Sequence, residues 1–199
     1  MKMYNVKSLM LAAMAFCLTA AFVACDNDNE SSTVTLTDVN GSYAGTVKTD
    51  VAQPASREAN ASEPTGTEVT AAVQNDSIEF LNFPVTDLIA SIAGEEHVDD
   101  IVNLLGTVDY KVGFLPSFGK SNTIISLSLD PQTLTLQYGE GETSTKIDVT
   151  VAATEAGTYT YNGQTLAFNL KVTEVKVNGE AFDFPETTFT FSLAKKTRN

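Results

Sequence analysis

The residues best suited to acid–base or metal chemistry gather around the single histidine, His97. It lies in the acidic sequence EEHVDD, residues 95–100, where His97 and Asp100 would share one face of a helix. A tight zinc site needs three or four ligands, and the sequence has no second histidine to help complete one. We favour an acidic, solvated helix start that the helix dipole stabilises. We therefore expect no metal and no cofactor.

Nucleophilic catalysis has equally little support in the sequence. A Ser-His-acid triad would have to use His97, and no Gly-x-Ser-x-Gly motif is present. Acidic residues are numerous enough for the carboxylate pair of a glycoside hydrolase. Most of them, however, fall at turns or on the polar side of strands, where exposure to solvent explains them. We therefore expect a protein that is not an enzyme.

Cys25 is the residue whose position suggests a chemical modification. Lys2 and Lys7 flank a short basic start, an apolar run covers residues 8–21, and the sequence turns acidic directly after Cys25. A charged start, a short apolar stretch and small residues before a processing point are typical of a secretory signal, and the stretch is too short to span a bilayer. We expect residues 1–24 to be a signal peptide.

The residues FVAC at 22–25 resemble a bacterial lipobox, in which the cysteine is acylated, for example with palmitate, and becomes the first mature residue. The alternative is an ordinary secretory signal with an incidental cysteine. The acidic residues 26–30 resemble the surface-export signal of Bacteroidetes-type lipoproteins, although they would also suit a flexible tether over 25–32. The resemblance implies an outer-membrane lipoprotein that faces the cell surface and whose membrane partner is reached through Cys25.

The composition of the mature part is strongly acidic. It holds 25 acidic residues and, without Lys2 and Lys7, 10 of the 12 basic ones, which gives a net charge of −15. Such a charge argues against binding nucleic acid or anionic phospholipid through electrostatics. The length suits one domain, residues 33–199, and with Cys25 acylated no disulfide can form in the mature chain. We expect a monomer whose stability comes from packing.

The first part of this domain predicts short strands around one loop. Residues 33–38 and 42–49 alternate and are rich in threonine, which favours two strands. Residues 50–66 contain two prolines and few bulky side chains, which is typical of a mobile loop. Residues 68–73 and 77–83 then predict a hairpin.

A helical pattern follows Pro84. Apolar residues recur at helical spacing over 85–92 and again over 98–105, and each run ends at a glycine, Gly94 or Gly106. We expect one or two short helices, at about 85–105, that cover an open end or face of a sheet.

The rest of the chain predicts strands at 108–114, 125–129, 134–138, 147–151, 158–161, 166–177 and 189–193. Asp130-Pro131 is expected to supply the turn between the second and third of these. Asn162-Gly163 predicts a tight hairpin in which both residues have positive φ, and Asn178-Gly179 a second one. The apolar parity changes at residues 173–174, which predicts a β-bulge. About ten strands result.

These patterns predict an all-β fold, an antiparallel meander that forms either a barrel or a strongly curved two-layer sandwich. The opening GSYAG at 41–45 and the segment IEFLNFP at 78–84 resemble those of the uncharacterised lipocalin-like (calycin-like) lipoproteins of gut Bacteroidetes, a domain of unknown function. That resemblance implies a barrel with an interior for a small ligand.

Aromatic residues are the remaining functional candidates. We assign to the interior parity Tyr110, Phe114, Tyr138, Phe168, Phe189 and Phe191. They would pack the core, or in a wide barrel they would line an apolar pocket with Tyr43 at its base. The candidate ligand-binding residues are therefore Tyr43, Tyr110, Phe114, Tyr138 and Phe168. The expected function is binding a small apolar or glycan-derived ligand, and the alternative is a structural or accessory subunit that docks on another cell-surface protein.

Overall fold

The computed structural model describes residues 34–52, 66–141 and 144–197. The proposed signal peptide, Cys25, the acidic tether and most of the predicted loop at 50–66 lie outside these residues. Over the described part the chain forms eleven strands, two α-helices and two short 3-10 helices. No helix in this part is both long and apolar enough to cross a membrane.

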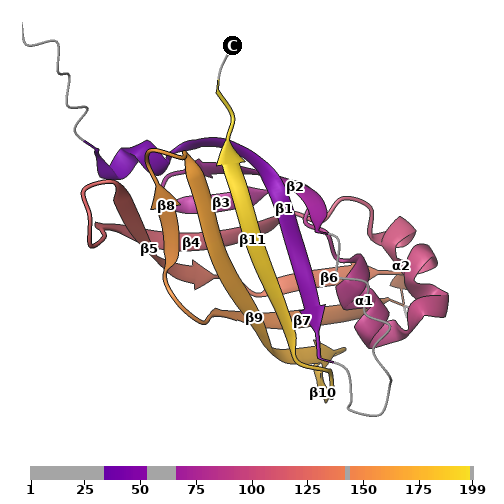
Figure 1. The fold of residues 1–199 in the computed structure, drawn as a ribbon. Coiled ribbons are helices and arrows are strands. Elements are labelled where there is room, and N and C mark those ends of the chain that lie inside the picture. Colours follow the sequence, from indigo (N-terminus) through magenta and orange to yellow (C-terminus); the bar gives the residue numbers. More distant parts are fainter. Residues whose placement is uncertain (1–33, 53–65, 142–143, 198–199) are drawn as a thin grey trace, which may run out of the picture. The chain divides into compact units, whose positions relative to one another are not determined.

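Eight antiparallel strands form a closed ring (Figure 1). In ring order they are β1 (Gly41–Val51), β2 (Thr67–Gln74), β3 (Ser77–Phe80), β4 (Tyr110–Phe118), β5 (Ile124–Pro131), β8 (Gly157–Thr160), β9 (Thr165–Val177) and β11 (Thr187–Lys195). Strand β11 closes the ring because it pairs with β1 on one side and with β9 on the other. The prediction of an all-β antiparallel fold is confirmed, with the barrel as the arrangement adopted.

A second group of strands continues the wall beyond the ring. It contains β6 (Leu134–Tyr138), β7 (Thr145–Ala153) and β10 (Glu180–Phe182). The first half of β9 pairs with β8 and β11, whereas its second half pairs with β7 and β10. One strand therefore joins the ring to this extension.

The predicted bulge at residues 173–174 lies at the junction of the two halves of β9. Thr150 pairs with Glu174 and Val151 with Val172, which leaves Thr173 as the extra residue. Its hydroxyl donates to the Thr150 carbonyl at 3.2 Å. A bulge increases the local bend and twist, so it redirects β9 from the ring to the extension.

The predicted helices are confirmed. They are α1 (Thr86–Ala93) and α2 (Val98–Leu105), joined by the 3-10 turn η2 (Glu95–His97). Gly94 and Gly106 end them with φ of 86° and 63°, as the sequence predicted. Their inward faces bury Leu88, Ile89, Val98 and Ile101. The helices lie at the end of the barrel where the extension leaves the ring, and α2 contacts β6 (Figure 1).

The first predicted strand, residues 33–38, is wrong, because the described part begins with a 3-10 helix, η1 (Leu36–Val39). The Asp38 carboxylate accepts a hydrogen bond from the Thr35 backbone N–H at 2.6 Å, and the Asp38 N–H donates to the Thr35 carbonyl. Alternating threonines favour a strand only where a partner strand is available. Here β2 and β11 already occupy both edges of β1, the strand that follows.

Two turns correct the expected boundaries. The hairpin after β8 forms, but the positive φ falls on Gln164, at 49°, and not on Asn162 or Gly163. Thr160 pairs with Thr165, so the loop has four residues and needs one left-handed residue at its end. Strand β1 also continues to Val51, inside the predicted loop, while β3 ends at Phe80, three residues before the expected Phe83.

Closure of the ring depends on a close approach at Gly45. A Cβ on this residue would lie 2.1 Å from the Ser192 carbonyl oxygen of β11. We predict that Gly45→Ala forces β1 and β11 apart and lowers the free energy of unfolding by about 3 kcal/mol. Gly163→Ala is the control, since its nearest neighbour would be at an ordinary 3.5 Å. Urea denaturation of both variants measures the difference, and equal stabilities would contradict the prediction.

Candidate functional site

The interior of the barrel is filled by aromatic side chains. Phe168 stacks on Phe191 with 4.4 Å between ring centroids, and Phe191 also lies 5.3 Å from Phe80. Phe83 contributes a ring 4.8 Å from Tyr110 and 5.5 Å from that of Phe189. These side chains are buried and stabilise the core through their contacts with one another.

The five predicted ligand-binding residues do not form one pocket. Phe114 and Phe168 are buried in the core, and Tyr138 is partly buried on β6. Tyr110 alone among the five lines a surface groove, which is described below. Alternation along the strands predicts the inward parity of each residue. It does not distinguish a filled barrel from a hollow one, because that depends on how side chains from facing strands meet.

Tyr43 lies at the end of the barrel covered by η1. Its hydroxyl donates to the Val39 carbonyl at 2.6 Å, and its ring meets Tyr159 edge-on at 6.5 Å. Burial, together with the neighbouring Tyr159, raises the pKa of the Tyr43 phenol well above its usual range. The hydroxyl is thus neutral and already hydrogen-bonded, which makes Tyr43 a structural residue that fixes η1.

The wall of the barrel opens between β4 and β6. The ladder between β4 and β5 ends at the pair Val112 and Pro131. Two further contacts hold the strands together: the Gln132 N–H donates to the Lys111 carbonyl at 3.2 Å, and the Tyr110 hydroxyl donates to the Gln132 carbonyl at 3.0 Å. Beyond them the chain continues as β6, which pairs with β7 and not with β4. We call this opening the seam.

The seam corrects one sequence prediction. Asp130-Pro131 was expected to be a turn that brings the strands on either side of it together. In the structure β5 runs through Pro131, and β5 and β6 do not pair with each other. The two strands have different partners, β4 and β8 for one and β7 for the other. Local sequence could not reveal this, because partner choice is set by strands distant along the chain.

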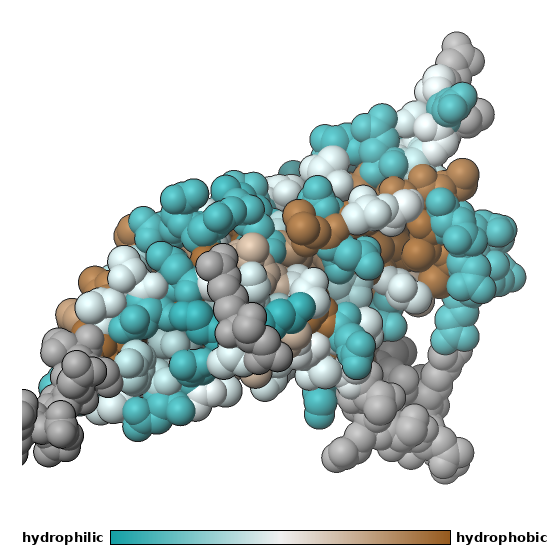
Figure 2. Space-filling view, turned by 90° about the horizontal axis from the view of Figure 1, so that it is seen from above, coloured by the Kyte–Doolittle hydropathy of each residue, from teal (hydrophilic) through white to brown (hydrophobic). Residues whose placement is uncertain are grey.

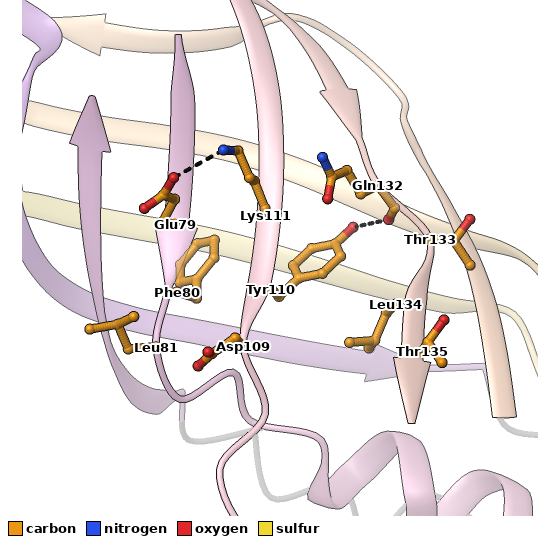
Figure 3. A pocket seen from close by; sticks show the side chains of 10 residues that line it. All are labelled: Glu79, Phe80, Leu81, Asp109, Tyr110, Lys111, Gln132, Thr133, Leu134 and Thr135. Carbon is orange, nitrogen blue, oxygen red and sulfur yellow. Dashed lines mark hydrogen bonds and ion pairs between the residues drawn. The ribbon is translucent and has the colours of Figure 1, made fainter. Parts of the chain in front are cut away.

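A groove with a volume of about 320 Å³ lies at the seam (Figure 3). Its lining comes from β3, β4 and the start of β6: Glu79, Phe80, Leu81, Asp109, Tyr110, Lys111, Gln132, Thr133, Leu134 and Thr135. Tyr110 and Leu134 lie between β4 and β6, and Leu81 is largely exposed. Apolar surface and hydrogen-bonding groups therefore meet in one open site.

Charges in the groove are partly neutralised. The Lys111 ammonium donates to the Glu79 carboxylate at 3.0 Å. This hydrogen bond and the positive charge of Lys111 lower the pKa of Glu79, so it stays ionised at neutral pH. Burial raises the pKa of the Tyr110 phenol, which therefore stays a neutral donor. Asp109 adds an exposed carboxylate to the same lining.

The histidine cluster places no further group at this site. His97 lies on η2, where its Nε2 is 3.3 Å from the Glu96 carboxylate, and both side chains are exposed. Within residues 34–52, 66–141 and 144–197, no three histidine, cysteine or acidic side chains lie close enough to hold a metal ion. The groove residues Asp109, Gln132 and Thr133 were missed by sequence reasoning, since turn-like polar residues carry no distinctive pattern.

The fold and groove define a closed antiparallel β-barrel with an open surface site. Residues 38–177 match the family described as Domain of unknown function (DUF4840), and the chain belongs to that family. The match extends from η1 to the end of β9, and the closing strand β11 follows it. Comparison with curated proteins and with solved structures found no match for this chain.

The last contacts before the seam generate a prediction about Tyr110. Tyr110→Phe removes the donor that holds the Gln132 carbonyl, and we expect a loss of about 1 kcal/mol in unfolding free energy. We also expect faster amide exchange over residues 132–136, because this hydrogen bond restrains the start of β6. Tyr161→Phe is the control on a partly buried tyrosine in the loop after β8. Exchange unchanged in both variants would show that the seam does not depend on this contact.

Proposed function

We propose that this protein is a lipid-anchored, non-enzymatic binding module with a lipocalin-like barrel, and that its ligand lies in the groove at the seam. The observation that carries the proposal is the groove itself. The strands β4 and β6 separate there, and both apolar and hydrogen-bonding side chains line the groove between them. The aromatic packing of the interior argues for a site at the surface instead of an enclosed one.

The lining supports a small amphipathic ligand, including a glycan-derived one. Leu81 and Leu134 provide apolar surface, and the carboxylate of Asp109, the amide of Gln132 and the hydroxyl of Thr133 can accept or donate hydrogen bonds. A few placed polar groups beside apolar side chains are typical of small-molecule sites. Figure 2 shows hydrophobic side chains gathered near the helical end of the barrel, the end at which the seam opens.

A binding role fits the electrostatics of the groove better than catalysis. A carboxyl group that acts as a general acid at neutral pH needs a raised pKa. Lys111 has the opposite effect on Glu79, whose pKa is lowered. The ion pair also fixes the position of the carboxylate. Glu79 is therefore suited to orienting a ligand.

The groove proposal is tested by filling the site. We predict that the chain carrying Cys25→Ser, incubated with extracts of its own cells, retains a non-covalent ligand that native mass spectrometry detects. Thr133→Trp, at an exposed position of the lining, should abolish the adduct because the indole occupies the groove. Ser192→Trp, exposed on β11, is the matched control and should keep it. An adduct that persists in Thr133→Trp would place the ligand elsewhere.

The anchor is a separate part of the proposal. We place the protein at the outer membrane, facing the cell surface, on the basis of the FVAC motif and the acidic residues after it. Cys25→Ser should remove the protein from the membrane fraction and prevent labelling by a palmitate analogue, because the thiol is the attachment point. The wild-type chain is the control. A variant that stays in the membrane fraction would contradict lipid attachment at Cys25.

A second candidate function is docking on another cell-surface protein. The specific observation is that β6 ends the strand order of the sheet, so one of its edges has no partner strand among the described residues. A free edge can accept an extended segment of another chain. Loss of the small-molecule adduct from every extract, with capture of a partner that Thr133→Trp prevents, would favour this role.

A further inference from the structure

The end of the barrel opposite α1 and α2 brings together the segments that we call the amino-terminal rim. They are η1, the turn at 75–76, Phe118 with the β4–β5 loop at 119–123, the loop at 161–164, and residues 195–197 at the end of β11 and directly after it. Hydrogen bonds connect them: Phe114 N–H to the Asp76 carbonyl, Tyr161 N–H to the Thr123 carbonyl, and Lys195 N–H to the Gln164 carbonyl. The rim is thus one continuous surface at the end where the described chain begins (Figure 1).

One large aromatic side chain is exposed at this rim. Phe118, the last residue of β4, has the parity of the buried Tyr110, Val112 and Phe114 but is 58% exposed. Leu115 is 72% exposed on the outer face of the same strand, three residues before the tip, where it pairs with Ser128 of β5. The left-hand end of the view in Figure 2 likewise shows hydrophobic side chains among hydrophilic ones. An aromatic ring exposed at the tip of a hairpin can enter the interfacial region of a bilayer.

The charges of the two ends differ in sign. Among the described residues, the amino-terminal rim carries Lys120, Lys195 and Lys196 against Asp38 and Asp76. By contrast, residues 81–110, which include both α-helices, contain six acidic residues and no lysine or arginine. The chain as a whole carries a formal charge of −13. The rim therefore has a net charge of +1 over its described residues, in contrast to the acidic helical segment.

The rim is also the end at which the described chain begins, at Val34. Residues 25–33 precede Val34, the first described residue, and nine residues span at most about 30 Å. A lipid on Cys25 would therefore keep this end of the barrel within about 30 Å of the bilayer.

We propose that the amino-terminal rim rests on the membrane surface, with Phe118 in the interfacial region and Lys120 and Lys196 among the lipid headgroups. Aromatic and apolar side chains beside lysines are the combination that the bilayer interface favours. The acidic helical end and the groove then point away from the membrane, which keeps the groove open to ligands. The proposal rests on the anchor part of the proposed function and does not depend on which ligand the groove binds.

Single-tryptophan fluorescence tests this orientation, because the native chain contains no tryptophan. Phe118→Trp reports on the rim. Leu104→Trp on α2, where the leucine is 65% exposed, is the matched control at the other end. Each acylated chain is reconstituted into phosphatidylcholine vesicles with brominated acyl chains. We expect a blue-shifted emission and at least twofold quenching for Phe118→Trp, and neither for Leu104→Trp.

The outcomes separate this inference from the proposals on which it builds. Vesicle-bound protein in which both tryptophans stay unquenched, or in which Leu104→Trp is quenched instead, would overturn the orientation while leaving the anchor intact. A blue shift of Phe118→Trp that appears without vesicles and is insensitive to bromine would indicate contact with a second protein copy, and would also overturn it. Failure of the acylated chain to bind vesicles would remove the anchor and the inference together, whereas the groove is tested on the Cys25→Ser chain.

Discussion

The pairing of β9 with four other strands is the interaction on which the rest of the structure depends. Its first half pairs with β8 and β11, and the second of these pairings closes the ring. Its second half pairs with β7 and β10 and carries the extension. The bulge at Thr173 lies between the pairing with β11, which ends at Lys171, and the pairing with β10, which begins at Val175, and it bends the strand without ending it.

On the other side of the barrel, the separation of β6 from β4 follows from the way in which β9 pairs. Because β7 pairs with the second half of β9, β6 is drawn to β7 and away from β4. The helices α1 and α2 cover the apolar interior that this exposes, and the seam remains at their margin. The groove is thus a consequence of topology: β5 pairs with β4 as far as Pro131, whereas β6, which follows it in the chain, pairs with β7. Its mixture of apolar and polar groups reflects its position at the boundary between core and surface.

The two ends of the barrel have different chemistry, and this asymmetry connects the proposals. One end holds η1, several lysines and an exposed aromatic tip, while the other holds an acidic helical cap beside the groove. Lys195 links these features at the first end, since its ammonium donates to the Asp38 carbonyl and lies 5.9 Å from the Tyr159 ring. A protein held at one end and open at the other needs this kind of separation, because a site facing the bilayer would be closed to soluble ligands.

Local patterns in the sequence determined most of the strands, the two helices with their terminal glycines, the Asn178-Gly179 turn and the bulge, because each depends on backbone preferences and on the period of apolar residues. The sequence also identified Tyr43, Tyr110, Phe114 and Phe168 as inward-facing. Only the tertiary structure decided that residues 36–39 form η1, that Phe83 belongs to the aromatic core, and that β5 and β6 take different partners. These outcomes depend on contacts between segments far apart in the chain. The groove residues Asp109, Gln132 and Thr133 became a site only when two strand ends were brought face to face.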